Sequence, residues 1–231
     1  MKLKRINLHN HTHFSDGRTT PKELIENAIS SKLDAVAITD HYEYFLGFFK
    51  FKSNINLYLK VLEHLKKKYS KKIKILTGLE IDLKLCDEID LPYELSEKID
   101  ILLFERVYTF DDLNKLIKIR KNFPNKIGLA HPKLDAFTDL KKLANLLEKN
   151  KIFLELNTSC YIYKHDKEKY DLSKLPLIFE EQEDFFKLLK NRKVEISVST
   201  DNHWKEDDIN DLNRAYSFLK KMNLEKNFIK I

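Results

Sequence analysis

Eight residues of the kinds that bind divalent metal ions recur along this chain, and most of them stand at the end of a short apolar run. They are His9, His11, Asp16, His41, Glu80, His131, Asp201 and His203. Imidazole and carboxylate are ligand groups that zinc, manganese and iron share. Because five separate apolar runs end in this way, we expect the runs to converge and the ligands to meet in space. The pattern predicts a hydrolytic site that holds several metal ions.

The spacing inside two of the motifs fits this interpretation. Residues i and i+2 of an extended strand point to the same side, so His9 and His11 can face one metal ion while Asn10 faces away. The same geometry applies to Asp201 and His203 if the extended backbone continues that far. Each pair is therefore predicted to supply two ligands to one site.

A third motif places a carboxylate directly before a histidine. Adjacent residues of a strand cannot share a face, so we expect His41 to be the ligand and Asp40 to orient it from outside the ligand set. No Ser–His–Asp or Cys–His arrangement stands out in the sequence. A hydrolase that relies on metal ions is therefore the better interpretation.

The segments that must position these residues alternate between strand and helix. Apolar runs predict seven strands, at 3–9, 34–39, 73–80, 100–107, 127–131, 152–157 and 194–199. Helical patterns fill the gaps at 21–32, 54–70, 111–123, 139–150, 180–191 and 207–222. The first opens with a capping box at Thr20 and Glu23, and Ser53 is the predicted cap of the second. Alternation of this kind favours parallel strands wrapped by helices, and no linker or repeat divides residues 1–231, so we predict one domain.

The positions of the ligands favour a closed barrel over an open sheet. In barrels of this kind the site is built at the carboxyl ends of the strands. The first, second, third, fifth and seventh predicted strands all end in His, Asp or Glu. Only closure would bring ligands from the first and last strands together, and no GxGxxG motif supports a dinucleotide-binding sheet. We therefore predict the α/β class, with a distorted TIM-like (β/α)7 barrel in a single domain.

The composition fits a compact enzyme. Of the 231 residues, 42% are hydrophobic, which is enough for a substantial core. No apolar run approaches the roughly eighteen residues of a membrane span. The N-terminus leads straight into a ligand-bearing strand, unlike a signal peptide. Cys86 and Cys160 form neither a CxxC motif nor a disulfide framework. We expect a cytoplasmic protein without a membrane partner.

The net charge of +6 raises the question of a nucleic-acid partner. Basic residues cluster at Lys66–Lys68, at Lys71–Lys74, at Lys121 and Lys126, at Lys149 and Lys151, and at Arg192–Lys193. Each cluster lies where a helical pattern ends and the next strand begins, and cations there stabilise helix C-termini. We expect these lysines on the face opposite the metal ions, so nucleic acid stays an open partner but not the favoured one.

Five stretches of the chain resemble the successive motifs of the PHP (polymerase and histidinol phosphatase) domain family. They are NLHNHTHFSDG, AITDH, TGLEI, LAHP and STDNH, in the same order and over essentially the whole chain. The resemblance implies a distorted barrel of seven strand–helix units that binds two or three divalent ions (Zn, Mn or Fe) and hydrolyses phosphoesters. It implies that His9, His11, Glu80 and Asp201 hold one ion, that Glu80 bridges to a second ion bound by His131, and that Asp16, His41 and His203 hold a third. The stretch LELNTS, in which Asn157 ends the sixth strand, resembles a family segment that borders the metals.

The chain departs from the family pattern at the fourth strand. Many family phosphatases end this strand in a Ser-x-His segment whose histidine binds a metal, whereas this chain has Glu105 and Arg106. Glu105 could replace the histidine, since carboxylate binds the same ions. The alternatives are a site with only two metals, a position with weak metal affinity, or a rim salt bridge between Glu105 and a lysine.

Two segments that leave the predicted metal face are rich in aromatic side chains. The first, 41–53, contains Tyr42, Tyr44, Phe45, Phe48, Phe49 and Phe51, and the second, 158–177, contains Tyr161, Tyr163, Lys164, His165 and Lys167. Aromatic walls beside cations would suit a planar group that carries phosphate. The same aromatics would also pack these loops onto the barrel rim, and we favour packing. We likewise interpret His13, His64 and His165 as surface or packing residues.

The favoured function is a metal-dependent phosphoesterase, most simply a phosphomonoesterase for a small phosphorylated metabolite such as histidinol phosphate or a nucleotide. Divalent ions would lower the pKa of a water molecule and hold the phosphoryl oxygens. The alternatives are a nuclease or exonuclease on short nucleic acid, a non-catalytic RNA-binding barrel of the RNase P subunit type, and an amide hydrolase. A scaffold has no need for ligands at its strand ends, which argues against the RNA-binding barrel. The sequence identifies neither the general acid nor the oligomeric state.

Overall fold

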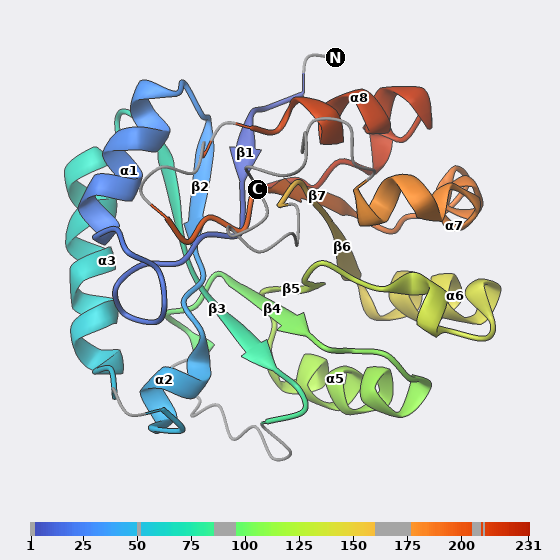
Figure 1. The fold of residues 1–231 in the computed structure, drawn as a ribbon, viewed down its shortest axis with the longest axis horizontal. Coiled ribbons are helices and arrows are strands. Elements are labelled where there is room, and N and C mark those ends of the chain that lie inside the picture. The colour runs from blue at the N-terminus through green and yellow to red at the C-terminus, as the bar shows by residue number, and fades with distance from the viewer. Residues whose placement is uncertain (1–2, 50–51, 86–95, 160–176, 205–208, 210) are drawn as a thin grey trace, which may run out of the picture.

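Seven parallel strands form one sheet in the computed structural model of the chain, and they follow one another in sequence order from β1 to β7. The structure describes residues 3–49, 52–85, 96–159, 177–204, 209 and 211–231. The strands are β1 Ile6–Asn7, β2 Ala35–Ile38, β3 Lys74–Asp82, β4 Ile101–Glu105, β5 Lys126–Leu129, β6 Ile152–Asn157 and β7 Ile196–Ser199. Figure 1 shows these strands at the centre of the molecule, with helices outside them.

The first and last strands lie side by side, so the sheet closes on itself. The backbone N–H of Leu8 donates to the carbonyl of Val198 at 3.3 Å, and that of His11 donates to Asn202 at 2.8 Å. A parallel bridge also joins Asn10 to Asn202. The sheet is therefore a nearly closed barrel, as the ligand positions predicted, and both ends of the chain contribute to the same rim.

The helices cover the outside of the barrel. They are α1 Pro21–Ser30, α2 Tyr42–Leu46, α3 Ile55–Tyr69, α5 Phe110–Asn122, α6 Leu140–Asn150, α7 Glu183–Leu189 and α8 Asn213–Lys221, with short 3-10 turns at Leu134–Ala136, Ile178–Gln182 and Glu225–Asn227. Thr20 and Thr109 each cap a helix through a capping box. These caps fix where α1 and α5 begin relative to the strands.

The packing of α3 on the sheet shows how helix and strand are joined. Its buried residues include Tyr58, Leu62 and Leu65, at the spacing that lines one helical face. The Tyr58 hydroxyl donates to the carbonyls of Ile38 and Gly78 at 2.9 and 2.7 Å. This contact links α3 to β2 and β3 just below the rim. Among the described residues, no helix has the length and apolar character needed to cross a lipid bilayer.

Three expectations about the helices need correction. The cap of α3 is Asn54, because the Ser53 hydroxyl instead donates to the carbonyl of Phe14. The segment expected as one helix at 180–191 begins with a 3-10 turn and becomes α-helical only at Glu183. The last helix begins at Asn213 rather than 207.

A short helix, α2, was not expected. It occupies Tyr42–Leu46 inside the segment interpreted as a loop, and Gly47 ends it with a φ of 86°. Glu43 of this helix is buried and accepts a hydrogen bond from the Asp82 N–H at 2.6 Å. Tertiary contacts of this kind stabilise a helix that is too short to be marked by periodicity.

The strand ends divide the polar residues into two groups. At the amino ends, Lys66 pairs with Asp100 and Lys126 pairs with Glu195, both at 2.5 Å. Lys74 begins β3 at the same end of the barrel. The predicted metal ligands lie at the opposite, carboxyl ends of the strands, which is the barrel polarity that the sequence indicated.

Candidate metal centre

Four donor atoms from three strand ends converge at the centre of the rim. The Nε2 atoms of His9 and His11 lie 3.0 Å apart. Oε2 of Glu80 lies 3.1 and 3.2 Å from these two nitrogens, and Oδ1 of Asp201 lies 3.3 and 3.2 Å from them. Donor atoms arranged tetrahedrally about one ion at bonds of about 2.05 Å would stand about 3.3 Å apart. The measured separations of 3.0 to 3.3 Å are close to that value.

The second oxygen of Glu80 faces a different histidine. Its Oε1 lies 3.2 Å from Nε2 of His131, while its Oε2 faces His9, His11 and His41. The side chain is only 1% exposed, so both oxygens must find partners inside the site. This single carboxylate therefore joins two groups of donors, as a bridging ligand would.

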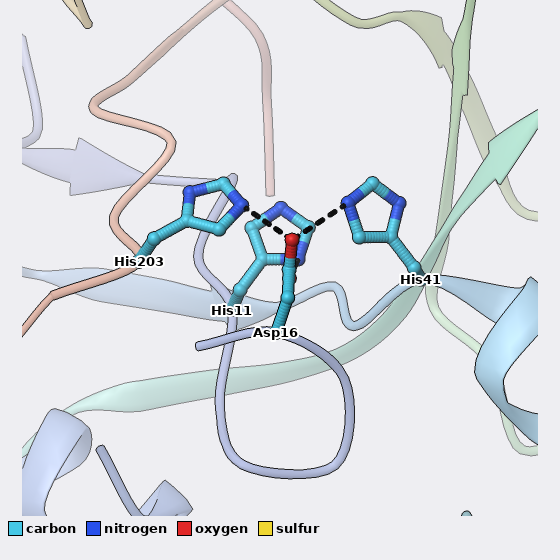
Figure 2. A group of neighbouring side chains, drawn as sticks. All are labelled: His11, Asp16, His41 and His203. Atoms are coloured by element: carbon cyan, nitrogen blue, oxygen red, sulfur yellow. Dashed lines mark ion pairs between the residues drawn. The ribbon is translucent and has the colours of Figure 1, made fainter. Parts of the chain in front are cut away.

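A third group surrounds Asp16 (Figure 2). Its Oδ2 lies 3.4 Å from Nε2 of His203 and 3.7 Å from Nε2 of His41. His11 lies behind them and stacks on His203 with ring centroids 4.1 Å apart. Donor atoms of all four side chains lie within 4.8 Å of one another. The structure thus brings together all eight residues that the sequence singled out.

Two of these eight residues have strained backbones. His131 and Asp201 follow the ends of β5 and β7 with φ values of 29° and 49°, in the left-handed region that non-glycine residues rarely adopt. Arg106, just after β4, has a φ of 57°. Each such residue costs on the order of 1–3 kcal/mol and persists where its surroundings hold it. At His131 the backbone N–H donates to Glu155, which supplies part of that support.

Glu155 is a residue of the site that the sequence analysis missed. It is 1% exposed, lies on β6, and accepts from His9 Nδ1 at 2.8 Å and from the Ser199 hydroxyl. A carboxylate behind a metal-binding histidine fixes the orientation and tautomer of the ring. The available signal was the charged residue inside the apolar run IFLELN, two positions before Asn157.

Asn157 borders the same region. Its Oδ1 accepts the Ser159 N–H at 2.7 Å, and its Nδ2 is buried with no hydrogen-bond partner among the described residues. Together with His131 and Glu155 it lines a small pocket beside the rim. That Asn157 supports the metal ligands without binding a metal itself stays a prediction.

Asp40 lies where it was expected but has other partners. Its carboxylate accepts from the N–H and hydroxyl of Thr12, both at 2.7 Å, and from the Ser15 hydroxyl at 2.6 Å. The expectation that Asp40 orients His41 is therefore corrected. Asp40 instead anchors the loop that carries Asp16, because its side chain points away from its neighbour along the chain.

That loop is also fastened to the last motif. The Arg18 N–H donates to the His203 carbonyl at 2.8 Å, and the Arg18 guanidinium stacks over Trp204 at 4.0 Å. Among the described residues no carboxylate pairs with this guanidinium. Arg18 is thus a cation fixed by stacking on Trp204, and it lies next to Asp16 and His203.

Carboxylates change the acid–base properties of the buried histidines. Burial lowers the pKa of His11, but hydrogen bonds to Asp201 and Glu80 outweigh it and raise the pKa to about 10. Burial also lowers the pKa of His131, and the hydrogen bond to Glu80 reverses this to about 8. Without metal ions these two rings hold protons at neutral pH, and metal binding would displace them.

Two groups at the edge of the centre favour their neutral forms. Burial lowers the pKa of His41 to about 4, against the opposing charge of Glu80. Burial, together with the charge of Glu80, raises the pKa of Glu105 to about 7. A neutral imidazole is the form that binds a metal ion, so His41 is ready to act as a ligand.

The donor set fits divalent metal ions. Oδ1 of Asp201 is buried and lies 3.2 to 3.4 Å from ring nitrogens of His9, His11 and His203, so its lone pairs point into the cluster. Two imidazole nitrogens lie 3.0 Å apart with carboxylate oxygens around them. This combination of donor atoms is typical of a cation site.

The aromatic segments are described only in part. In 41–49, Tyr44 stacks on Phe49 at 4.4 Å and on His41 at 6.4 Å, while Phe48 is 57% exposed. Phe45 is buried against Tyr58, which is the packing role we favoured. His13 and His64 are exposed. Tyr161, Tyr163, Lys164, His165 and Lys167 lie outside the described residues, as do Phe51, Cys86 and Cys160.

Comparisons with known proteins agree with this geometry. The PHP domain matches residues 7–145. An uncharacterized protein of Methanocaldococcus jannaschii is 31% identical over 159 residues, which are 67% of this chain and 68% of that protein. The histidinol-phosphatase of Lactococcus lactis is 32% identical over 91 residues, which are 38% of this chain but only 34% of the length of that relative.

A solved structure resembles the whole fold. The histidinol phosphate phosphatase of Lactococcus lactis, complexed with Zn, L-histidinol and phosphate, aligns with a TM-score of 0.64. The alignment covers 96% of this chain and 94% of that one at 20% sequence identity. This likeness shows the barrel fold that the two chains share.

Proposed function

Because this chain belongs to the PHP domain family, we propose that it is a metal-dependent phosphoesterase that hydrolyses phosphomonoesters of small molecules. The observation that carries the proposal is the position of Glu80, whose two oxygens face two separate groups of histidines at 3.1 to 3.3 Å. A carboxylate that joins two donor groups is what a centre of adjacent divalent ions requires.

Two or three divalent ions (Zn, Mn or Fe) are the cofactors in this proposal. His9, His11, Glu80 and Asp201 would hold one ion, Glu80 and His131 a second, and Asp16, His41 and His203 a third. When bound, such ions lower the pKa of water and offset the charge of a phosphoryl group. The zinc in the Lactococcus lactis structure makes zinc the first ion to test.

Residues of the chain would prepare the site for this chemistry. Glu155 holds the His9 ring through Nδ1, which leaves Nε2 directed at the centre. Asp40 fixes the loop of Asp16 through Thr12 and Ser15. Ground-state positioning of this kind reduces the reorganisation that the reaction would otherwise need.

Arg18 would bind the phosphate group of the substrate at the rim. Its guanidinium stacks over Trp204 at 4.0 Å and pairs with no carboxylate in the described part of the chain. Arginine binds phosphate through two parallel hydrogen bonds. The substrate would therefore approach past the Asp16 group.

The substrate class in this proposal rests on the relatives and on where the lysines lie. A phosphorylated amino alcohol such as histidinol phosphate is one candidate, since the Lactococcus lactis structure contains histidinol and phosphate. A nucleotide monophosphate is another. The lysines that would suit a nucleic-acid channel lie in part at the amino ends of the strands, where Lys66 and Lys126 already pair with acids.

The test is a direct comparison of two substrate classes. The metal-loaded protein would be assayed against a panel of sugar, amino-alcohol and nucleotide monophosphates and against short single-stranded RNA and DNA, at about 0.15 M salt. We expect phosphate release from at least one monoester to exceed nucleotide release from every oligomer. Faster cleavage of the oligomers would replace the proposal with a nuclease, and a centre that binds metal without either activity would favour a binding role.

A further inference from the structure

Glu105 ends β4 directly above the bridging carboxylate. The register pairs Asp82 with Glu105 and Glu80 with Leu103, so Glu105 stands on the face of the sheet that carries Glu80, one step nearer the rim. Its side chain is 19% exposed. The end of β4 therefore directs a carboxylate towards the candidate metal centre.

The carboxylate of Glu105 faces two imidazoles that Glu80 also faces. Its Oε1 lies 3.9 Å from Nδ1 of His41, and its Oε2 lies 4.0 Å from Nε2 of His131. The same two nitrogens lie 3.3 and 3.2 Å from Glu80. Donor atoms of His41, Glu80 and Glu105 lie within 4.8 Å of one another.

Among the described residues, only imidazoles are close enough to Glu80 and Glu105 to act as cationic partners. In the described part of the chain, no lysine or arginine lies within ion-pair distance of Glu105. The adjacent Arg106 points its guanidinium at Asp82 instead. The rim salt bridge considered from the sequence is thus not what the described residues form. Two carboxylates this close inside a protein repel each other when both are ionised, and a metal ion between them would offset that repulsion.

We propose that Glu105 is a metal ligand that replaces a histidine, so that Glu80, Glu105 and His131 form an oxygen-rich position beside the imidazole-rich ones. The proposal rests on the metal centre of the proposed function. Imidazole suits zinc, whereas carboxylate suits manganese and other hard ions. The position that contains Glu105 should therefore show a smaller preference for zinc over manganese than the positions formed by His9, His11 and His203.

The experiment measures metal binding and needs no substrate. Metal-free protein would be titrated with Mn²⁺ and followed by electron paramagnetic resonance, and Zn²⁺ would then be added in competition. The variants are Glu105→Gln, which removes the charge, and Glu105→His, which restores an imidazole. Asp82→Asn is the matched control, since it removes the same charge at the paired position of β3, where the carboxylate faces Arg106. Circular dichroism would confirm that each variant is folded.

We expect Glu105→Gln to weaken one class of Mn²⁺ sites by about tenfold or more, and Glu105→His to raise the zinc-over-manganese preference of that class by a similar factor. Asp82→Asn should stay within about threefold of the parent protein. Unchanged Mn²⁺ binding in Glu105→Gln, an unchanged ion preference in Glu105→His, or equal losses in Glu105→Gln and Asp82→Asn would each overturn the proposal. If Glu105→Gln does not fold, the ion preference of Glu105→His decides alone.

The outcome is separable from that of the proposed function. A protein with the expected ion preferences and no phosphoesterase activity would retain the Glu105 proposal and lose the functional one. An active phosphoesterase whose ion preference does not change when residue 105 is substituted would retain the functional proposal and lose the Glu105 proposal.

Discussion

At the scale of single residues, the distinctive feature is that one carboxylate serves two groups of donors. Glu80 presents Oε2 to His9 and His11, and Oε1 to His131. A glutamine would keep the shape and one hydrogen-bond acceptor but could not neutralise two cations. In the proposed centre, the role of this side chain would therefore be electrostatic more than steric.

Glu80→Gln should abolish most activity while the fold persists. We expect turnover of a phosphomonoester to fall by at least about a hundredfold, equivalent to about 2.7 kcal/mol in the barrier. The free energy of unfolding of the metal-free protein should fall by less than this. Steady-state kinetics and urea unfolding measure the two quantities. Parental turnover in the variant would show that Glu80 does not bridge.

A second residue prediction concerns the carboxylate behind His9. Glu155→Gln should weaken metal binding by about 10- to 100-fold, because an amide orients the ring less strongly and does not increase its basicity. Glu195→Gln is the matched control, since Glu195 lies at the other end of the barrel and pairs with Lys126. Metal affinity measured by calorimetry should change only in the first variant. Equal effects would mean that the overall charge matters, and the contact with His9 does not.

The two glutamates also show what the sequence could predict at this scale. Glu80 stands near the end of an apolar run, as the histidines do. Its residue type and its position were therefore enough to predict that it lies among them at the rim. Glu155 lies inside an apolar run, and its importance depends on β6 lying next to β7, where Ser199 donates to it. Asp40 was assigned the wrong partner because a strand pattern states which way a side chain points but not which loop folds back over it.

At the scale of elements, strands were predicted within a few residues because buried parallel strands are continuous apolar runs. The helices were predicted less well where tertiary contacts decide. Ser53 was expected to cap α3, and its hydroxyl instead bonds Phe14, a residue 39 positions away. The α2 helix is held by the contact between Glu43 and β3, which no local pattern reveals.

The loop that carries Asp16 depends on a close backbone approach at Gly17. A Cβ atom at this position would overlap the carbonyl of His11 and the amide nitrogen of Thr12. Gly17→Ala should therefore displace Asp16 and weaken the group formed with His41 and His203. We expect the loss of one metal equivalent in elemental analysis after dialysis.

A second variant distinguishes this local effect from general destabilisation. Thr20→Ala removes the cap of α1 and should cost about 1 kcal/mol of unfolding free energy. It should leave the metal content unchanged, because the hydroxyl that the substitution removes bonds only the Glu23 N–H in the described residues. If both variants lose metal equally, the loop conformation is not the cause.

At the scale of the whole molecule, the parallel barrel separates two chemistries. Metal-type donors occupy the carboxyl ends of the strands, and the lysines that pair with Asp100 and Glu195 occupy the amino ends. This separation was predictable, because alternation of strand and helix leaves only one direction for every strand. The closure between β1 and β7 was inferred from the ligands alone, since no local signal specifies which strands become neighbours.

The separation predicts that lysines at the amino ends do not affect turnover. Changing Lys67, Lys68, Lys71 and Lys72 together to glutamine should leave kcat/KM for a small phosphomonoester within about threefold of the parent. All four residues are exposed, so their side chains do not pack in the hydrophobic core. A tenfold or larger loss would mean that substrates reach the site from the other face of the barrel.

The stability of the whole barrel should depend on metal ions and on pH together. In the metal-free protein the pKa of His131 is raised to about 8 and that of His11 to about 10. The stabilisation that these protonated rings provide is complete below the unfolded pKa of about 6.5 and is lost as the pH rises through the folded values. Metal ions displace the same protons, so they bind more tightly when fewer protons compete. The metal-induced stabilisation therefore increases as the pH rises, because the metal-free protein loses the protons that compete with the metal ions.

We therefore expect the increase in Tm on adding Zn²⁺ or Mn²⁺ to be larger at about pH 8.5 than at about pH 6.5. With free metal at 100 times its dissociation constant, the stabilisation would be about 2.7 kcal/mol, or roughly 5–10 °C for a chain of this size. Differential scanning fluorimetry of chelator-treated protein, with and without metal, measures the shift at each pH. Glu80→Gln should show a smaller increase at both pH values, because the bridge between the two donor groups is gone. A shift that is independent of pH, or that shrinks as the pH rises, would mean that protons on these histidines do not compete with the metal ions.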